Sequence, residues 1–206
     1  MEKKVKFAEQ NADLAYLNNK QGNPEEDKER DERKRESLAE RLRSGDREAA
    51  AELVDGYYEQ IYLFMRRLGH DRQASEDLTQ EIFFNAWHHI GQLKDGAALK
   101  GWMYRIAGNV SRLHRRRRRH KEVIGIEGIE IPHDGSRQPE IVEQNEQLEQ
   151  LKDAVEGLPM KLRETIVLHY MQQLTIIEAA EAAGLNQGTF KSRLNRALKR
   201  LRKEIN

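Results

Sequence analysis

The stretch LTIIEAAEAAGLNQGTFKSRLNRALKRLRK, residues Leu174 to Lys203, decides the fold of the C-terminal part of this chain. It is typical of two short helices joined by a tight turn, in which Gly184 ends the first helix and Asn186 caps the second. The pattern therefore predicts a helix-turn-helix.

The second helix of this motif has two chemically different faces. It carries seven Lys or Arg residues between Lys191 and Lys203, followed by a single acid, Glu204. An ordinary solvated helix mixes charges of both signs, so this pattern favours contact with the phosphates and base edges of DNA. Helical spacing predicts Phe190, Leu194, Ala197, Leu198 and Leu201 on the buried face, and Ser192, Asn195, Arg196 and Lys199 on the exposed face.

Length and composition set the broad class. The chain has 206 residues, of which 34% are charged and 6% aromatic. These values predict about two small helical domains and an all-α fold. The absence of cysteine excludes a disulfide framework and a thiolate metal site.

The N-terminus lacks the apolar core of a signal peptide, and no apolar run approaches the roughly 18 residues of a membrane span. We therefore expect a cytoplasmic protein without membrane insertion.

Four segments follow one another along the chain. Residues 1–36 hold nine basic and ten acidic side chains and are expected to be disordered or helical. Residues 37–121 form a predicted helical domain, because apolar residues recur there at helical spacing. Residues 122–139 are rich in glycine and contain two prolines, which predicts a flexible linker. Residues 140–206 form a second helical domain that ends in the helix-turn-helix. The apolar stripes of the first domain are Leu53, Tyr57, Ile61 and Met65, then Leu78, Ile82, Phe83, Ala86, Trp87 and Ile90, then Trp102, Ile106, Val110 and Leu113.

Three separated motifs precede the helix-turn-helix in a fixed order. They are RLRSGDREAAAELVDGYYEQIYLFMRRLG from Arg41, ASEDLTQEIFFNAW from Ala74, and GWMYRIAGNVSRLHRRRRR from Gly101. Together with the C-terminal stretch, they make the chain resemble the extracytoplasmic-function (group IV) sigma factors of bacterial RNA polymerase from about Leu38 to Arg202. The resemblance implies a transcription-initiation factor that binds the polymerase core, recognises the −35 and −10 promoter elements and promotes DNA melting.

The resemblance assigns polymerase binding to the second motif. Its polar side would dock on the clamp helices of the β′ subunit, and the family also contacts the β flap. A purely structural alternative is that Asp77 and Glu81 favour the start of a helix through its macrodipole. The implied core-polymerase-binding residues are Asp77, Gln80, Glu81 and Phe84.

The third motif is implied to bind the −10 element. Asn109 matches the family's asparagine in the pattern RIAxN, and its amide can both donate and accept hydrogen bonds, as base reading requires. The arginines would hold phosphates, although such a run also fits a general polyanion patch. Trp102 is expected in the core rather than as a stacking platform. The implied −10 contacts are Arg105, Asn109, Arg112, Arg115 and Arg116.

The helix-turn-helix is implied to bind the −35 element. Ser192 and Arg196 lie at the centre of the exposed face and would read base edges, while Lys191 and Arg193 would hold phosphates. Thr189 would begin the helix close to the backbone. Phe190 departs from the family, which more often has Val there, and the larger ring is expected to tilt the recognition helix slightly.

An enzymatic function has little support in the sequence. It contains no HExxH, GxxxxGK[ST] or G-x-S-x-G motif, its histidines are scattered, and we expect no catalytic residue, cofactor or metal. The resemblance adds an anti-sigma factor to polymerase and promoter DNA as a partner. A free-standing DNA-binding regulator is the alternative, and it would not need the surface from Asp77 to Trp87. A third reading is an interaction module whose charged tail, residues 1–36, serves as a docking arm.

Overall fold

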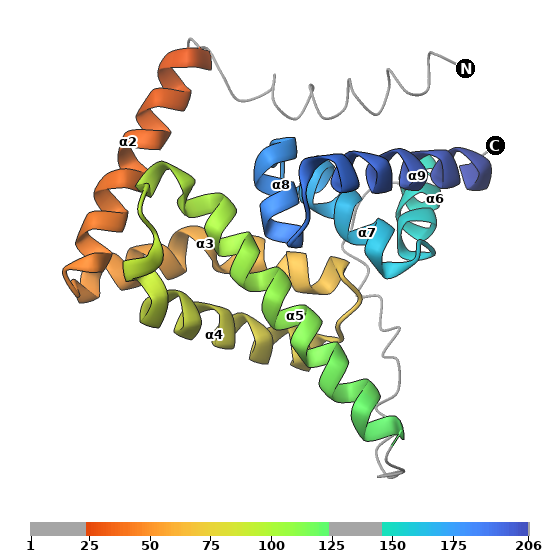
Figure 1. The fold of residues 1–206 in the computed structure, drawn as a ribbon, viewed down its shortest axis with the longest axis horizontal. Coiled ribbons are helices and arrows are strands. Elements are labelled where there is room, and N and C mark those ends of the chain that lie inside the picture. Colours follow the sequence, from red (N-terminus) through yellow and green to blue (C-terminus); the bar gives the residue numbers. More distant parts are fainter. Residues whose placement is uncertain (1–23, 124–145, 206) are drawn as a thin grey trace.

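The structure, a computed structural model, describes residues 24–123 and 146–205, and the regular secondary structure in these ranges is all helical (Figure 1). Two helical bundles follow one another, which confirms the predicted all-α fold. The predicted linker, residues 122–139, lies almost entirely outside the described residues. The elements of the N-terminal bundle are α2 (Pro24–Arg43), α3 (Arg47–Arg67), α4 (Arg72–His89), η1 (Ile90–Gln92), η2 (Gly96–Ala98) and α5 (Leu99–Val123). Those of the C-terminal bundle are α6 (Glu146–Glu156), α7 (Met160–Ile166), the π-helical turn η3 (Val167–Met171), α8 (Ile176–Ala183) and α9 (Gln187–Ile205).

Local sequence signals set the ends of the helices in the N-terminal bundle. The Asp46 side chain accepts hydrogen bonds from the first backbone N–H groups of α3, and Asp71 does the same for α4. Such caps stabilise a helix by about 1 kcal/mol each, because they satisfy donors that have no partner within the helix. Between α3 and α4 the chain turns at Gly69, whose φ of +85° lies in the left-handed region that favours glycine.

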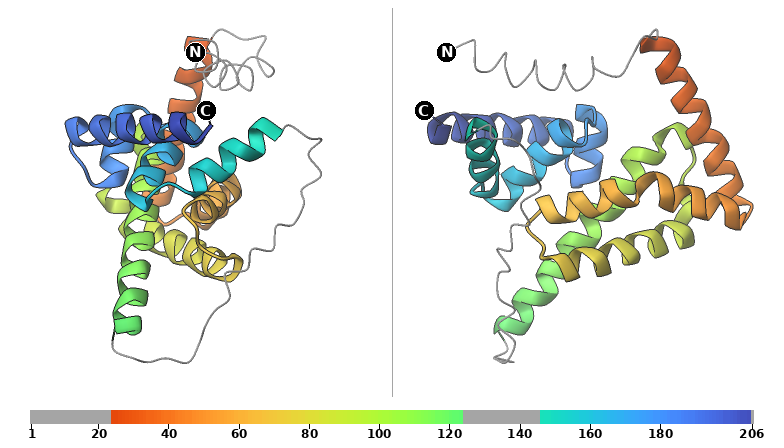
Figure 2. Two further views of the ribbon diagram at one scale, coloured as in Figure 1. Left: turned by 90° about the vertical axis from the view of Figure 1, so that its right-hand side faces the viewer. Right: turned by 180° about the vertical axis from the view of Figure 1, so that it is seen from behind.

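Helix α2 begins within the charged N-terminal segment. Its C-terminal half packs on α3 and η2 through Leu38, Ala39 and Leu42, which are all buried. Its N-terminal half projects away from both bundles (Figures 1 and 2). Gly96 permits the close approach of η2, because a Cβ atom at this position would lie only 2.5 Å from the Cα atom of Glu36.

The apolar stripes of the N-terminal bundle meet in one core. The first two predicted stripes are confirmed at most of their positions, because Leu53, Ile61, Met65, Leu78, Ile82, Ala86 and Ile90 are buried. Tyr57, Phe83 and Trp87 are half-buried and pack against this core. The third stripe is confirmed only in part. Val110 is buried, whereas Trp102 and Ile106 are half-buried and Leu113 is exposed. The most buried face of α5 consists instead of Leu99, Met103, Tyr104 and Ala107.

The two bundles pack directly on each other. Helix α5 of the first bundle lies against α8 of the second, and this is the most extensive contact between any two described elements (Figure 2). Glycine allows the approach, because a Cβ atom at Gly108 would lie 2.9 Å from the carbonyl oxygen of Ala182. The buried side chains of both bundles form one continuous apolar core. Within residues 24–123 and 146–205, no helix combines the length and apolar character that crossing a bilayer requires.

Candidate nucleic-acid interface

In the helix-turn-helix, local backbone and side-chain contacts cap both ends of α8 and the start of α9. A capping box joins Thr175 and Glu178 at the start of α8. Gly184 ends this helix with a φ of +67°. The Oδ1 atom of Asn186 accepts a hydrogen bond of 2.8 Å from the backbone N–H of Thr189, and so caps α9. These contacts confirm the two boundaries that were predicted from Gly184 and Asn186.

The recognition helix α9 presents the two faces that its spacing predicts. Phe190 and Ala197 are fully buried, and Leu194 and Leu201 are buried as well. The opposite face is exposed and consists of Lys191, Ser192, Asn195, Arg196 and Lys199.

Two exposed residues at the centre of α9 are linked to each other. The Arg196 guanidinium donates one hydrogen bond of 3.2 Å to the Ser192 hydroxyl and another of 3.4 Å to the Ser192 carbonyl oxygen. These bonds lay the guanidinium along the exposed face of the helix. Arg193 differs, because it is half-buried. Its positive charge favours the ionised form of the buried Glu164 of α7. Of the predicted −35 residues, Lys191, Ser192 and Arg196 share the exposed face. Thr189 and Arg193 are half-buried, and Arg193 lies beside α7.

A pocket of about 340 Å³ lies between α4 and α5. Asn109 and Arg105 of α5, two of the predicted −10 residues, line it and face the polar residues of α4. An apolar wall of Trp102, Ile106 and Leu113 completes it. Trp102 therefore borders the pocket and is not enclosed in the core. The polar residues that line the pocket are Glu81, Asn85, His89, Gln92, Arg105 and Asn109.

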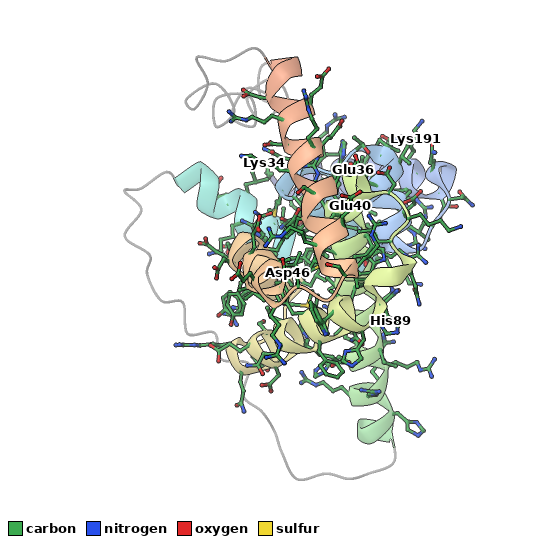
Figure 3. The ribbon with its side chains drawn as sticks, turned by 90° about the vertical axis from the view of Figure 1, so that its left-hand side faces the viewer. Lys34, Glu36, Glu40, Asp46, His89 and Lys191 are labelled. Atoms are coloured by element: carbon green, nitrogen blue, oxygen red, sulfur yellow. The ribbon has the colours of Figure 1, made fainter. Side chains whose placement is uncertain are left out.

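Hydrogen bonds orient the side-chain amide of Asn109 and determine which ring nitrogen of His89 carries the hydrogen. The Oδ1 atom of Asn109 accepts a hydrogen bond of 2.7 Å from Arg112, which orients the amide. The Nδ1 atom of His89 lies 2.8 Å from the Asn85 carbonyl oxygen. A carbonyl oxygen only accepts, so Nδ1 carries the hydrogen, and in the neutral ring Nε2 is then an acceptor. His89 lies on the same side of the molecule as Lys191 of α9 (Figure 3). The sequence pattern did not single out His89 as a site residue. Its spacing of i+4 from Asn85 and i+8 from Glu81 on α4 could have indicated its place beside the pocket.

The arginine run does not present all of its side chains to solvent. Arg112 donates a hydrogen bond of 2.6 Å to the Glu164 carboxylate. Arg115 donates to the carbonyl oxygen of Leu68 at the end of α3, and burial lowers the pKa of Arg115 to about 10. The charge therefore faces solvent mainly at residues 116–119, on the last turns of α5, which extend beyond the bundle (Figure 1).

The predicted polymerase-binding residues lie along one side of α4. Asp77 and Gln80 are exposed, and the Phe84 side chain is 64% exposed. The Phe84 ring packs on His88, with ring centroids 4.0 Å apart. Glu81 is half-buried and points to the pocket, so it borders both the α4 surface and the predicted −10 site.

The sequence matches two known families in the expected order. Residues 53–121 match Sigma-70 region 2, and residues 148–201 match Sigma-70, region 4. The chain is 33% identical over 174 residues to the ECF RNA polymerase sigma factor SigW of Bacillus subtilis, covering 80% of this chain and 92% of SigW. It is 29% identical over 181 residues to the RNA polymerase sigma-H factor of Pseudomonas aeruginosa, covering 82% of this chain and 93% of that protein.

Solved structures with a similar fold include two protein complexes. The sigma factor RpoE, in complex with the anti-sigma factor NepR from Bartonella quintana, is 26% identical with a TM-score of 0.63, over 75% of this chain and 95% of that one. CnrH, in complex with the cytosolic domain of CnrY, has a TM-score of 0.60 at 23% identity, over 82% of this chain and 94% of that one. The second likeness concerns the fold alone.

Proposed function

Because the chain belongs to the ECF sigma factors of RNA polymerase, and so acts in promoter recognition and transcription initiation, we propose a division of labour between its two bundles. The C-terminal bundle reads the −35 element through α9, and the N-terminal bundle binds the polymerase core and captures the −10 element. The pocket beside Asn109 is the observation that carries the second half of this proposal.

At the −35 element, the exposed face of α9 enters the major groove. Ser192 and Arg196 contact base edges, since their side chains lie at the centre of this face. Lys191 and Arg193 flank them and neutralise phosphates, and Thr189 contacts the backbone at the start of the helix. Arginine can donate two hydrogen bonds to a guanine, which is worth about 1–3 kcal/mol of discrimination between bases.

At the −10 element, the pocket between α4 and α5 receives an unstacked base of the displaced strand. Asn109 offers an oriented amide for the edge of the base, and Trp102 offers an apolar wall. Arg105, Arg112, Arg115 and Arg116 are the proposed phosphate contacts. Arg116 is exposed, whereas Arg112 and Arg115 are engaged within the molecule and must exchange these partners to reach DNA.

Polymerase binding is assigned to the exposed side of α4. Asp77, Gln80 and Phe84 offer a carboxylate, an amide and a large exposed ring in two turns of helix, which suits a helical partner such as the β′ clamp. Glu81 links this surface to the pocket. Docking of a polymerase helix on this side of α4 would hold the −10 pocket at a fixed position relative to the polymerase.

The protein acts as a binding subunit and not as an enzyme. It works in the cytoplasm, where polymerase and promoter DNA are found. An anti-sigma factor regulates it, and the structurally similar sigma factor RpoE was solved in complex with the anti-sigma factor NepR.

Run-off transcription with purified core polymerase on a promoter library tests this function. Wild type should initiate from a small set of paired −35 and −10 sequences. Gln80→Ala/Glu81→Ala should reduce the transcript and also weaken binding to core polymerase. Asn109→Ala should reduce the transcript by about tenfold, equivalent to about 1.4 kcal/mol, while leaving binding to core polymerase unchanged.

Gln73→Ala is the matched control, because Gln73 is exposed on the first turn of the same helix, α4, and outside the proposed contacts. This variant should transcribe like wild type. Tight DNA binding without any initiation by core polymerase would contradict the sigma function and leave a polymerase-independent regulator.

A further inference from the structure

Helix α2 carries opposite charges on two of its sides. From Glu25 to Ser37 it has no apolar side chain, so this half of the helix relies on its charged residues. Lys34 and Glu36 point to opposite sides of the helix (Figure 3). The exposed acids on the side of Glu36 are Glu29, Glu36 and Glu40. The basic residues on the side of Lys34 are Arg30, Lys34 and Arg41, with Arg33 at the edge.

The basic side of α2 forms one wall of a groove, which we call the α2–α3 groove. The groove has a volume of about 650 Å³ and lies between α2 and the N-terminal part of α3. It is lined by the basic residues Arg30, Arg33, Lys34 and Arg41, together with Ser37, Leu38 and Glu52. The carboxylate of Glu52 already pairs with Arg41 at 2.6 Å. The α2 wall therefore carries excess positive charge, and the single apolar side chain offers little hydrophobic anchorage.

The basic side chains of this wall are available to another molecule. Arg30 pairs with Asp27 at 3.8 Å, and Arg33 pairs with Glu29 at 3.2 Å, both within α2. The Arg30 and Arg33 side chains are nevertheless 68% and 77% exposed. Ion pairs this exposed contribute little to stability, because water and salt screen them. Carboxylates of a partner can therefore replace those of α2.

The facing side of α3 carries the opposite charge. Four exposed carboxylates follow one another there at helical spacing, namely Glu48, Glu52, Asp55 and Glu59. Glu52 lines the α2–α3 groove, so this acidic row runs along its α3 wall. Duplex DNA carries a phosphate charge about every 1.7 Å and would be repelled by such a row. A protein helix can instead present acids to α2 and bases to α3, which matches both walls.

The groove opens away from the proposed promoter contacts. In Figure 3, Glu36 lies on the side of the molecule that carries Lys191 and His89, whereas Lys34 lies on the other side of α2. The side of α2 nearest to the promoter contacts is thus acidic and disfavours DNA. An occupant of the groove leaves α9 and the pocket beside Asn109 uncovered.

We propose that the α2–α3 groove docks a helical segment of a partner protein, with a row of acids that faces α2 and a row of bases that faces α3. This inference goes beyond the proposed function, because the groove contains none of the residues assigned to core polymerase or to promoter DNA. The basic row from Arg30 to Arg41 extends over about 16 Å, which three turns of a partner helix can follow. The partner binds this protein while promoter DNA is bound.

Fluorescence anisotropy with a synthetic two-faced peptide tests this docking. The probe is a fluorescein-labelled peptide of about 20 residues, long enough to form a helix in water, with glutamates along one face and lysines along the other. It should bind the full-length protein, and Arg30→Glu/Lys34→Glu should weaken binding about tenfold, because two attractions become repulsions. A peptide of the same composition with its charges interleaved should also bind about tenfold more weakly, since it cannot match both walls. Failure of the two-faced peptide to bind wild type at low salt would overturn the proposal.

The α3 wall provides the variant that separates a two-faced helix from a simple polyanion. Asp55→Lys/Glu59→Lys should weaken binding of the two-faced peptide about tenfold, because the lysines of the peptide lose their partners. For DNA or any other polyanion, the same variant strengthens binding, since it removes negative charge from the groove. Stronger peptide binding by this variant would therefore overturn the proposal. So would displacement of the peptide by a saturating promoter duplex.

Lys152→Glu/Lys161→Glu is the matched control, because both lysines are exposed on the C-terminal bundle and the change in net charge equals that of Arg30→Glu/Lys34→Glu. The control should bind the peptide like wild type. Equal weakening by the control and by Arg30→Glu/Lys34→Glu would show attraction to net charge alone and contradict docking in the groove. Circular dichroism verifies that each variant keeps its helices.

Sedimentation velocity tests whether a second copy of this chain occupies the groove instead. The protein should sediment as the same species with and without Arg30→Glu/Lys34→Glu. Self-association that this variant abolishes would overturn the proposal in favour of another copy of the chain. Since no step uses core polymerase, failure of the proposed function leaves all of these outcomes unchanged.

Discussion

The phenolic hydroxyl of Tyr104 in α5 donates a hydrogen bond to Oε1 of Gln172, and these two atoms lie 2.5 Å apart across the junction between the bundles. Burial raises the pKa of Tyr104, so the hydroxyl keeps its hydrogen and remains a donor. The Tyr104 ring also meets the edge of Phe64, with ring centroids 5.2 Å apart. One side chain thus links the core of the N-terminal bundle to the start of the helix-turn-helix.

Tyr104→Phe should lower the free energy of unfolding by about 1–3 kcal/mol, because it leaves a buried acceptor without its donor. The loss of unfolding free energy should lie at the upper end of this range, since Nε2 of Gln172 is already buried without a hydrogen-bond partner among the described residues. Urea unfolding followed by circular dichroism measures the difference. Tyr104→Phe/Gln172→Leu removes both polar partners and should recover most of the loss. A single variant as stable as wild type would contradict the bond.

His70 should make stability depend on pH. Its Nε2 lies 2.8 Å from the Ser111 hydroxyl, and burial, followed by the nearby charges of Arg115 and His114, lowers the pKa of His70 to about 3. Above pH 6.5 the ring is neutral in both the folded and the unfolded chain. As the pH falls from 6.5 towards 3, only the unfolded chain gains the proton, so stability falls by up to about 1.4 kcal/mol per pH unit.

Urea titrations between pH 7.5 and 5 test the contribution of His70. His70→Gln keeps a polar partner for Ser111 but cannot titrate, so the slope of unfolding free energy against pH should decrease by about 1 kcal/mol per unit. Ser111→Ala is the contrasting variant, because it removes the hydrogen bond and leaves the ring. It should lower stability at every pH and keep the slope. An identical slope in His70→Gln and wild type would show that the ring is not buried as a neutral group.

The helix-turn-helix could be predicted because its signals are local. Gly184 and Asn186 determine the turn by their own conformations and caps, and a helix that is buried on only one side shows its core face in its spacing. The buried face of helix α5 could not be predicted from apolar spacing in the same way. It packs on α4 and on α8 at once, so Tyr104 and Ala107 are buried while Trp102 lies at the pocket. A single apolar stripe cannot describe a helix with two neighbours.

The junction between the bundles could not be predicted from the sequence. Arg112 and Glu164 are separated by 52 positions, and neither has a local pattern that indicates its partner. The family resemblance assigned Arg112 and Arg115 the same role, contact with phosphates. Each is in fact committed to a different acceptor, because the end of α3 and the helix α7 come close to α5 only in the folded chain. Pairing of this kind depends on tertiary packing and leaves no periodic signal.

Phe190→Val tests the departure from the family at the recognition helix. The ring is fully buried beneath α9, so a smaller side chain leaves a cavity, and the free energy of unfolding should fall by about 2 kcal/mol. Ile177→Val on α8 is the matched control, because its side chain is 54% exposed, and it should change stability by less than about 0.5 kcal/mol. Equal stability of Phe190→Val and wild type would mean that the helix closes over the smaller residue, in which case the −35 preference should shift.

Lys191 and Arg196 should contribute to −35 binding in different ways, although both are exposed and basic on α9. Lys191→Ala removes a phosphate contact, so affinity should fall for every sequence, and the slope of log K against log salt should become shallower by about 0.9. Arg196→Ala removes a base contact, so it should cost about 1–3 kcal/mol of binding free energy on the preferred −35 sequence and much less on others.

Fluorescence anisotropy with polymerase-bound protein, on promoters selected by run-off transcription, measures both effects across a salt series. Lys152→Ala, on α6 and outside the helix-turn-helix, controls for the loss of one positive charge. If Arg196→Ala weakened binding equally on all sequences, Arg196 would be a phosphate contact, and base reading on this helix would fall to Ser192 and its neighbours.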